Sequence, residues 1–153
     1  MDLESELRLV EDAGPVAAFL EENDGLLTAG WTPGVEPAQG DEVGVYWATM
    51  RPTSAPDERY HARIGWLRYP GSPPSVKFAT DVRGRLDVQN AWPSCPGYRP
   101  SSFDICAAFT MEGYQTHPEW VAQHPWPTSG NPFLWVVEKL QGDLDRKYGG
   151  RAS

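Results

Sequence analysis

The sequence is poor in cysteine and has no long apolar run. Among 153 residues only Cys95 and Cys106 are cysteines, fewer than a small disulfide scaffold carries. No apolar segment approaches the roughly 20 residues that span a bilayer, and the acidic start of the chain is unlike a signal or transit peptide. We therefore expect no membrane segment, a cytoplasmic location and free thiols, although a Cys95–Cys106 pair stays open.

Several catalytic motifs are also missing. The chain has no glycine-rich phosphate loop, no Gly-x-Ser-x-Gly and no His-Glu-x-x-His, which leaves nucleotide binding, serine hydrolysis and metalloprotease activity unsupported. The possible metal ligands Cys95, Cys106, His117 and His124 are separated by ten, ten and six residues, whereas structural zinc sites usually contain close pairs such as Cys-x-x-Cys. We expect neither a metal nor a cofactor.

Basic residues are in the minority, with 13 Lys and Arg against 21 Asp and Glu and a net charge of −8. This balance argues against a general nucleic-acid partner. The charge is uneven: residues 1–42 contain eleven acidic residues and one basic residue, and residues 51–99 contain eight basic and four acidic ones. The basic middle is either a solvated sheet face or a docking surface for an acidic partner.

Aromatic residues are abundant, with seven Trp, six Tyr and five Phe. They provide enough apolar surface for a packed core despite fifteen Pro and fifteen Gly, so we expect residues 1–153 to form a single domain with many turns.

The order of the apolar patterns predicts an α+β fold. Leu3, Leu7 and Val10 have helical spacing, and the helix is expected to kink or break at Gly14-Pro15 before its apolar stripe continues to residue 20. Segments rich in β-branched and aromatic residues then predict an antiparallel meander with one face covered by the helix; the four strands are expected near residues 26–31, 43–50, 60–69 and 75–80.

The remainder is mostly irregular until a C-terminal helix. Residues 81–100 are expected to be a loop, residues 102–109 a short strand or buried turn, and residues 116–129 a proline-rich connection. Asn131 is then a good N-cap, followed by Pro132 in the first turn. We expect Gly149-Gly150 to end this helix as a cap rather than to form a ubiquitin-like tail. The expected buried stripe consists of Phe133, Val136, Val137, Leu140, Leu144 and Tyr148.

The third and fourth expected strands are joined by Tyr69-Pro70 and Pro73-Pro74. Because proline lacks an amide donor and fixes φ, this segment cannot form a tight two-residue hairpin and is expected to be a rigid, extended corner. The corner and the following strand resemble the same crossing in ubiquitin-conjugating (E2) enzymes. Phe103-Asp104-Ile105-Cys106 is similar to their nucleophile segment, and Trp126-Pro127 to the step before their next helix.

The resemblance implies a UBC-like fold made of an N-terminal helix, a four-stranded antiparallel meander and a C-terminal helix. Departures from the E2 pattern indicate a divergent protein, of the kind found in bacterial ubiquitin-like systems. The His-Pro-Asn that precedes the E2 cysteine has no counterpart between Thr80 and Cys106. In addition, the first helix is acidic, whereas the E2 helix that docks the activating enzyme is usually basic.

The resemblance assigns the chemistry to Cys106, which would accept an acyl group from a thioester and pass it to an amine. His117 is the expected oxyanion donor or base in place of the missing asparagine, with Asn90, Gln115 and Tyr114 as alternatives. Asp104 would orient the histidine or the incoming amine, or would cap a turn.

Two other interpretations of the cysteines stay open. The apolar neighbours of Cys106 also fit a small buried hydrophobic residue, and Cys95, in an expected exposed loop, is the second candidate for the reactive thiol.

Two functions follow from the resemblance. One is an E2-like carrier whose partners are a ubiquitin-like protein and an E1-like activating enzyme. The alternative is a catalytically inert, UEV-type protein-binding module, which the missing His-Pro-Asn favours.

Overall fold

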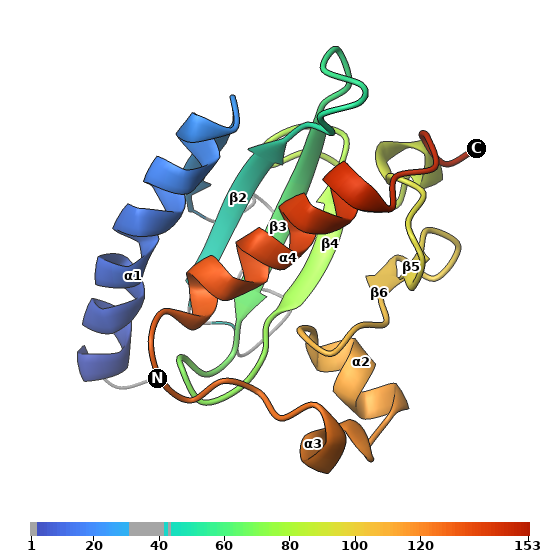
Figure 1. Ribbon diagram of the computed structural model, residues 1–153. Coiled ribbons are helices and arrows are strands. Elements are labelled where there is room, and N and C mark those ends of the chain that lie inside the picture. The colour runs from blue at the N-terminus through green and yellow to red at the C-terminus, as the bar shows by residue number, and fades with distance from the viewer. Residues whose placement is uncertain (1–2, 31–41, 43) are drawn as a thin grey trace.

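The computed structural model describes residues 3–30, 42 and 44–153. Within this part the chain forms an α+β fold, as predicted, with an N-terminal helix, a four-stranded antiparallel sheet and a C-terminal helix (Figure 1). The larger elements are α1 Leu3–Glu22, β1 Leu26–Ala29, β2 Gly44–Met50, β3 Tyr60–Trp66, β4 Ser75–Ala79 and α4 Pro132–Arg146. The short ones are η1 Gln89–Ala91, β5 Tyr98–Arg99, β6 Asp104–Ile105, α2 Met111–Thr116 and α3 Trp120–Gln123.

The main sheet is the predicted meander, with strand order β1-β2-β3-β4 and every neighbouring pair antiparallel. Alternation along β3 decides which side chains face the helices: Tyr60, Ala62, Ile64 and Trp66 are fully buried in the main core. The expected strand ends at Trp31 and Val43 lie outside the described residues.

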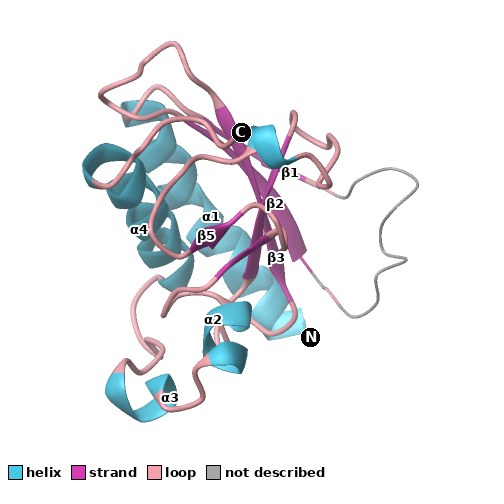
Figure 2. Ribbon diagram, turned by 90° about the vertical axis from the view of Figure 1, so that its right-hand side faces the viewer, coloured by secondary structure: helices cyan, strands magenta, loops and turns pink. Residues whose placement is uncertain are grey.

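Helix α4 lies across one face of the sheet, and α1 packs beside it (Figure 1). Viewed after a 90° turn, α4 stands clearly on one side of the strands (Figure 2). The sheet is therefore covered mainly by the C-terminal helix, with α1 as its neighbour in the same layer.

Helix α1 continues through Gly14-Pro15, so the expected break at this point is wrong. Buried Leu9 lies before the proline, and Val16 and Leu20 lie after it. Packing of both halves on the same core holds them in one helix, although Pro15 removes one amide donor.

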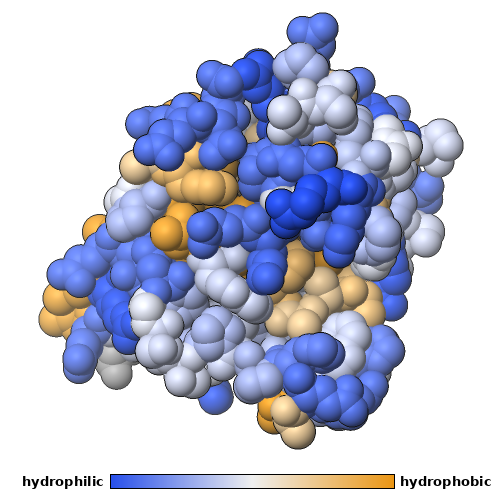
Figure 3. Space-filling model, viewed as in Figure 1, coloured by the Kyte–Doolittle hydropathy of each residue, from blue (hydrophilic) through white to orange (hydrophobic). Residues whose placement is uncertain are grey.

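The apolar residues in the first turns of α1 do not face the core. The side chains of Leu3, Leu7 and Val10 are 70%, 57% and 64% exposed, and apolar surface is visible over this end of α1 (Figure 3). The buried side of the helix is the one that carries Leu9, Val16 and Leu20. The predicted helix is confirmed, but its opening stripe points to solvent.

The proline corner spans the residues between β3 and β4, and no tight two-residue hairpin forms there, as predicted. It contains a turn at residues 69–71 and a cis peptide bond at Tyr69-Pro70, so it is not extended throughout. The buried Tyr69 ring packs edge-on against Trp66, with ring centroids 4.8 Å apart, and its hydroxyl donates to Asp12 of α1. The corner thereby links the sheet to the first helix.

The C-terminal helix begins as predicted. The Asn131 side chain accepts a hydrogen bond from the Leu134 amide at 2.9 Å, and Pro132 occupies the first turn. Of the expected stripe, five residues are fully buried and Tyr148 is half-buried. The helix ends at Arg146, earlier than expected.

Gly149-Gly150 is not the helix cap, because it pairs with another segment. The Gly149 amide donates to the Ser94 carbonyl and the Ser94 amide donates to the Gly150 carbonyl, both at 2.8 Å. This pairing fixes the chain end beside residues 92–94.

None of the helices in the described part of the chain has the length and apolarity needed to cross a membrane.

Candidate active site

Cys106 follows directly after the two-stranded ribbon formed by β5 and β6. Tyr98 lies opposite Ile105 and Arg99 opposite Asp104, and the pairing continues one step further, because the Cys106 amide donates to the Gly97 carbonyl at 2.8 Å. The Cys106 side chain is half-buried. It therefore lies at the surface of the fold but is held there by an ordered backbone.

The segment around Cys106 is attached to the edge of the main sheet. Lys77 of β4 donates to the Phe103 carbonyl at 2.6 Å, the Ser75 hydroxyl donates to Glu112 at 2.7 Å, and the Met111 amide donates to the Pro74 carbonyl at 2.8 Å. These hydrogen bonds lie on both sides of Cys106 in the sequence. The start of β4 thus positions the cysteine segment.

Thr110 closes the turn after the cysteine. Its hydroxyl donates to the Ile105 carbonyl at 2.6 Å and accepts from the Gly113 amide at 3.1 Å, so that it is the N-cap of α2. This one buried side chain connects the end of β6 to the next helix.

Cys95, the second candidate thiol, does not lie in an exposed loop. It is 9% exposed, and its thiol points to the Asp143 carbonyl of α4 at 3.8 Å. Burial, with the Asp143 charge adding to it, raises the pKa of Cys95 to about 12. A thiol with such a pKa is a poor nucleophile near neutral pH, and the two cysteines are not joined by a disulfide.

Asp104 is held by Arg99 rather than by a histidine. The guanidinium donates from Nε to one carboxylate oxygen at 2.6 Å and from Nη2 to the other at 2.8 Å. The Ser102 hydroxyl adds a third hydrogen bond at 3.2 Å.

His117 lies at the C-cap of α2 and is engaged by its own neighbours. Its Nδ1 is 3.1 Å from a Glu119 carboxylate oxygen, and its ring stacks on Trp120 with centroids 4.2 Å apart. Among the described residues no hydrogen bond joins Cys106 to His117 or to Asp104. The structure places Asp104 and Cys106 on one ribbon, and it gives no contact that brings His117 to them.

Among the described residues no hydrogen bond joins Tyr114, Gln115 or Asn90 to Cys106. The Tyr114 hydroxyl donates to the His124 carbonyl. Asn90 is in η1, where its backbone carbonyl accepts from Arg151 at 2.7 Å.

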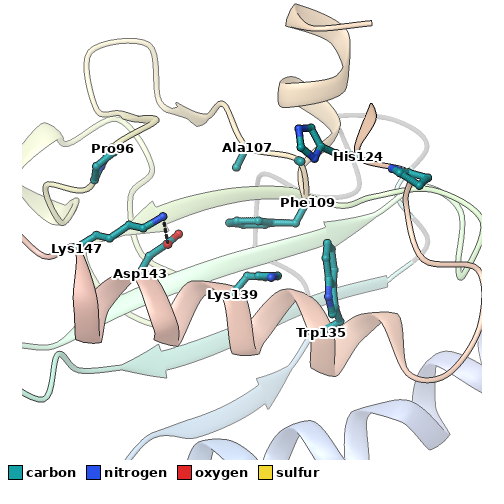
Figure 4. Close-up of a pocket in the computed structure, with 10 residues that line it drawn as sticks. Pro96, Ala107, Phe109, His124, Trp135, Lys139, Asp143 and Lys147 are labelled. Atoms are coloured by element: carbon teal, nitrogen blue, oxygen red, sulfur yellow. Dashed lines mark ion pairs between the residues drawn. The ribbon is translucent and has the colours of Figure 1, made fainter. Parts of the chain in front are cut away.

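A cavity of about 390 Å³ lies between the cysteine segment and α4. Figure 4 shows Phe109 and Trp135 as its aromatic walls, beside Lys139 of α4 and Lys147 at the C-cap of that helix. In the space-filling view a weakly apolar area bordered by hydrophilic surface lies over this part of the molecule (Figure 3). The lining residues are Pro96, Ala107, Ala108, Phe109, His124, Pro125, Trp135, Lys139, Asp143 and Lys147.

Charges at the cavity come from α4 and its C-cap. Lys147 pairs with Asp143 at 3.8 Å, and the Lys139 ammonium lies 5.1 Å from the centroid of the Trp135 ring. Burial raises the pKa of Asp143, although a hydrogen bond from Tyr98 opposes this. The cavity therefore combines aromatic walls with an excess of basic side chains.

Arg99, Lys139 and Lys147 were not predicted from the sequence as neighbours of the cysteine segment. A signal for Arg99 exists in the chain, since Pro100-Ser101-Ser102 favours a turn that would fold Arg99 back onto Asp104. Lys139 and Lys147 carry no such local signal, because their place depends on how α4 crosses the sheet.

In the residues that the structure describes, no group of three or more His, Cys, Asp or Glu side chains is arranged to hold a metal ion. No family model, curated protein or solved structure matches the chain. A functional assignment therefore depends on the geometry of the site and on the order of the elements around it.

Proposed function

We propose that this chain is a UBC-like protein that acts as an E2-type carrier. Cys106 accepts a ubiquitin-like protein as a thioester from an E1-like activating enzyme and passes it to an amine. The observation that carries the proposal is the contrast between the two thiols: Cys106 is half-buried on an ordered ribbon, whereas Cys95 is buried with its pKa raised to about 12.

The order of elements supports this assignment. The chain runs from a helix through a four-stranded antiparallel meander, with the proline corner between β3 and β4, to a cysteine segment and a C-terminal helix. This is the order that the resemblance to E2 enzymes implies. The cavity beside Ala107 and Ala108 provides space next to the cysteine for a bound segment of a partner.

The reaction consists of two acyl transfers. The Cys106 thiolate attacks the thioester carbonyl, a new carbon–sulfur bond forms, and the thiolate of the activating enzyme leaves. An amine then attacks the same carbonyl, a carbon–nitrogen bond forms, Cys106 leaves as a thiolate, and the amine loses a proton to solvent. Since a thioester is already activated, the scaffold has to position the groups and stabilise the oxyanion.

A transthiolation assay tests the proposal without a cognate activating enzyme. Ubiquitin bearing a C-terminal thioester with 2-mercaptoethanesulfonate is incubated with the protein and with its Cys106→Ala and Cys95→Ala variants. We expect an adduct that is removed by dithiothreitol in the wild type and in Cys95→Ala, and no adduct in Cys106→Ala. An adduct that survives Cys106→Ala would refute the site.

A second candidate function, the inert UEV-type module, is favoured by one observation. No side-chain hydrogen bond from the described residues reaches Cys106, and both His117 and Asp104 are engaged elsewhere. If the protein is such a module, no adduct should form at any ubiquitin thioester concentration, although a small alkylating agent should still modify Cys106. The same assay therefore separates the two functions.

A further inference from the structure

The ribbon formed by β5 and β6 has one buried and one accessible face. Tyr98 and Ile105 lie opposite each other, with exposures of 7% and 0%, and form the buried face. Arg99 and Asp104 form the next pair and are only half-buried. Because side chains alternate along a strand, Cys106 belongs to the same face as Asp104, and its half-buried side chain agrees with this.

The guanidinium of Arg99 is fixed in place on this face. Its Nε and Nη2 atoms hold the two oxygens of Asp104 at 2.6 and 2.8 Å, and the Ser102 hydroxyl holds the same carboxylate at 3.2 Å. A planar two-point pair of this kind sets the orientation of the guanidinium. Such preorganisation is what electrostatic stabilisation of a transition state requires.

Part of the Arg99 guanidinium remains available. The bonds to Asp104 use Nε and Nη2, and within the described part of the chain no acceptor takes a hydrogen bond from Nη1. The Arg99 side chain is 38% exposed. Asp104 lies opposite Arg99, and Cys106 follows Asp104 by two residues on the same face. Arg99 and Cys106 are therefore diagonal neighbours, a spacing of about 7–8 Å that a long side chain can reach across.

We propose that Arg99 is the oxyanion donor for acyl transfer at Cys106 and that Asp104 is the residue that positions it. The inference rests on the proposed function and supplies the group that the missing His-Pro-Asn leaves open. When a thiolate or an amine attacks the thioester carbonyl, the oxygen gains negative charge, and a free N–H of Arg99 donates to it. Arg99 transfers no proton, and its N–H releases the oxygen when the carbonyl re-forms and the thiolate leaves.

This assignment replaces His117 as the expected donor. His117 is paired with Glu119 and stacked on Trp120 beyond α2, whereas Arg99 is on the strand that pairs with the cysteine segment. It also gives Asp104 a role other than orienting a histidine or an amine.

The test compares two reactions at the same sulfur. When phenyl thioacetate acylates Cys106, its carbonyl oxygen becomes negatively charged in the tetrahedral intermediate. When iodoacetamide alkylates Cys106, the sulfur displaces iodide and no oxyanion forms. We expect Arg99→Gln to slow acylation at least tenfold, because losing one oxyanion donor costs about 10²- to 10³-fold, while alkylation changes less than about threefold. Arg99→Lys keeps the positive charge but lacks the planar set of guanidinium donors. Its acylation rate should lie between those of Arg99→Gln and the wild type.

Asp104→Asn tests the positioning role. It keeps a side chain of the same shape but weakens the hold on the guanidinium, so the acylation rate should fall while the alkylation rate stays constant.

The matched control for Arg99→Gln is Arg85→Gln. Arg85 makes the same two-point pair with Asp87, at 3.0 Å for both bonds, and both side chains are exposed. The control should leave both rates unchanged.

The outcomes separate the two proposals. If Arg99→Gln leaves the ratio of the acylation rate to the alkylation rate unchanged, the role of Arg99 is overturned, whether or not the protein accepts ubiquitin. Failure of the wild type to accept ubiquitin thioester, with a ratio that still depends on Arg99, would overturn the carrier function alone.

Discussion

The Tyr98 hydroxyl donates a 2.9 Å hydrogen bond to the Asp143 carboxylate and so joins the β5–β6 ribbon to α4. Asp143 lines the cavity beside the cysteine segment with its side chain 18% exposed, and Tyr98 is buried. The bond connects two segments that are 45 residues apart in the chain. Its loss should therefore loosen the ribbon as well as lower stability.

Tyr98→Phe should lower the free energy of unfolding by about 1.5–3 kcal/mol, the usual value for a hydrogen bond to a charged group. Urea unfolding of Tyr98→Phe, Asp143→Asn and the double variant measures the coupling between the two positions. Additive effects of the two substitutions would contradict a direct interaction.

The two thiols should differ strongly in reactivity. With a pKa of about 12, Cys95 has a thiolate fraction of only about 10⁻⁴ at pH 8, and its burial adds a steric barrier. We expect Ellman's reagent to modify one thiol rapidly in the folded protein, and Cys95 at least about 100-fold more slowly. Cys106→Ala should abolish the fast phase of modification. If Cys95→Ala abolishes the fast phase instead, Cys95 is the reactive thiol.

The sequence predicted the elements that have a strong local signal. In α4, Asn131 as the cap and the spacing of the apolar residues gave the start and the buried side correctly, and the β-branched and aromatic segments gave all four strands of the meander. In α1 the apolar residues lie on two sides of the helix. Spacing alone could not decide that Leu9, Val16 and Leu20, rather than Leu3, Leu7 and Val10, face the core.

The site was less predictable because it is built from contacts between segments. Strands β5 and β6 have two residues each, too few for a periodic pattern. The pairing of Arg99 with Asp104 depends on the intervening turn. The burial of Cys95 depends on α4, which begins 37 residues later in the chain. The choice of Cys106 over Cys95 came through a resemblance, and its role as the reactive thiol stays a prediction.

Glu112 should make stability depend on pH. Burial raises the pKa of Glu112, with opposing contributions from the Ser75 hydrogen bond and Lys77, and one of its oxygens is buried with no hydrogen-bond partner among the described residues. The folded state therefore keeps a proton at pH values where the unfolded chain has lost it. The contribution of Glu112 to stability must fall as pH rises from the unfolded pKa of 4.5 through the raised folded value.

Glu112→Gln cannot ionise, so it should gain stability relative to the wild type on going from pH 4 to pH 7.5. Urea midpoints at both pH values measure this. Glu138→Gln, on the exposed side of α4, is the control and should show no such gain. An equal effect of Glu112→Gln at both pH values would contradict the prediction.

The two sides of α1 should differ in what they contribute to stability. Leu20 is fully buried and Leu7 is 57% exposed in the same helix. Leu20→Ala leaves a cavity in the core and should cost about 2–5 kcal/mol, whereas Leu7→Ala should stay within about 0.5 kcal/mol. Chemical denaturation of the two variants checks this, and similar losses would mean that the first turns of α1 pack more closely than the structure has them.

Asn131 has two separate roles at the start of α4, and two substitutions distinguish them. Its carbonyl oxygen accepts from the Leu134 amide at 2.9 Å, and its amide donates to the Asp12 carbonyl of α1 at 3.0 Å. Asn131→Ala removes both bonds and should cost about 1–2 kcal/mol. Asn131→Asp keeps the cap, places a negative charge at the positive end of the helix dipole and loses only the bond to α1, so it should recover most of that loss in urea unfolding at pH 7. Equal losses in the two variants would mean that the link between α1 and α4, and not the cap, is what Asn131 contributes.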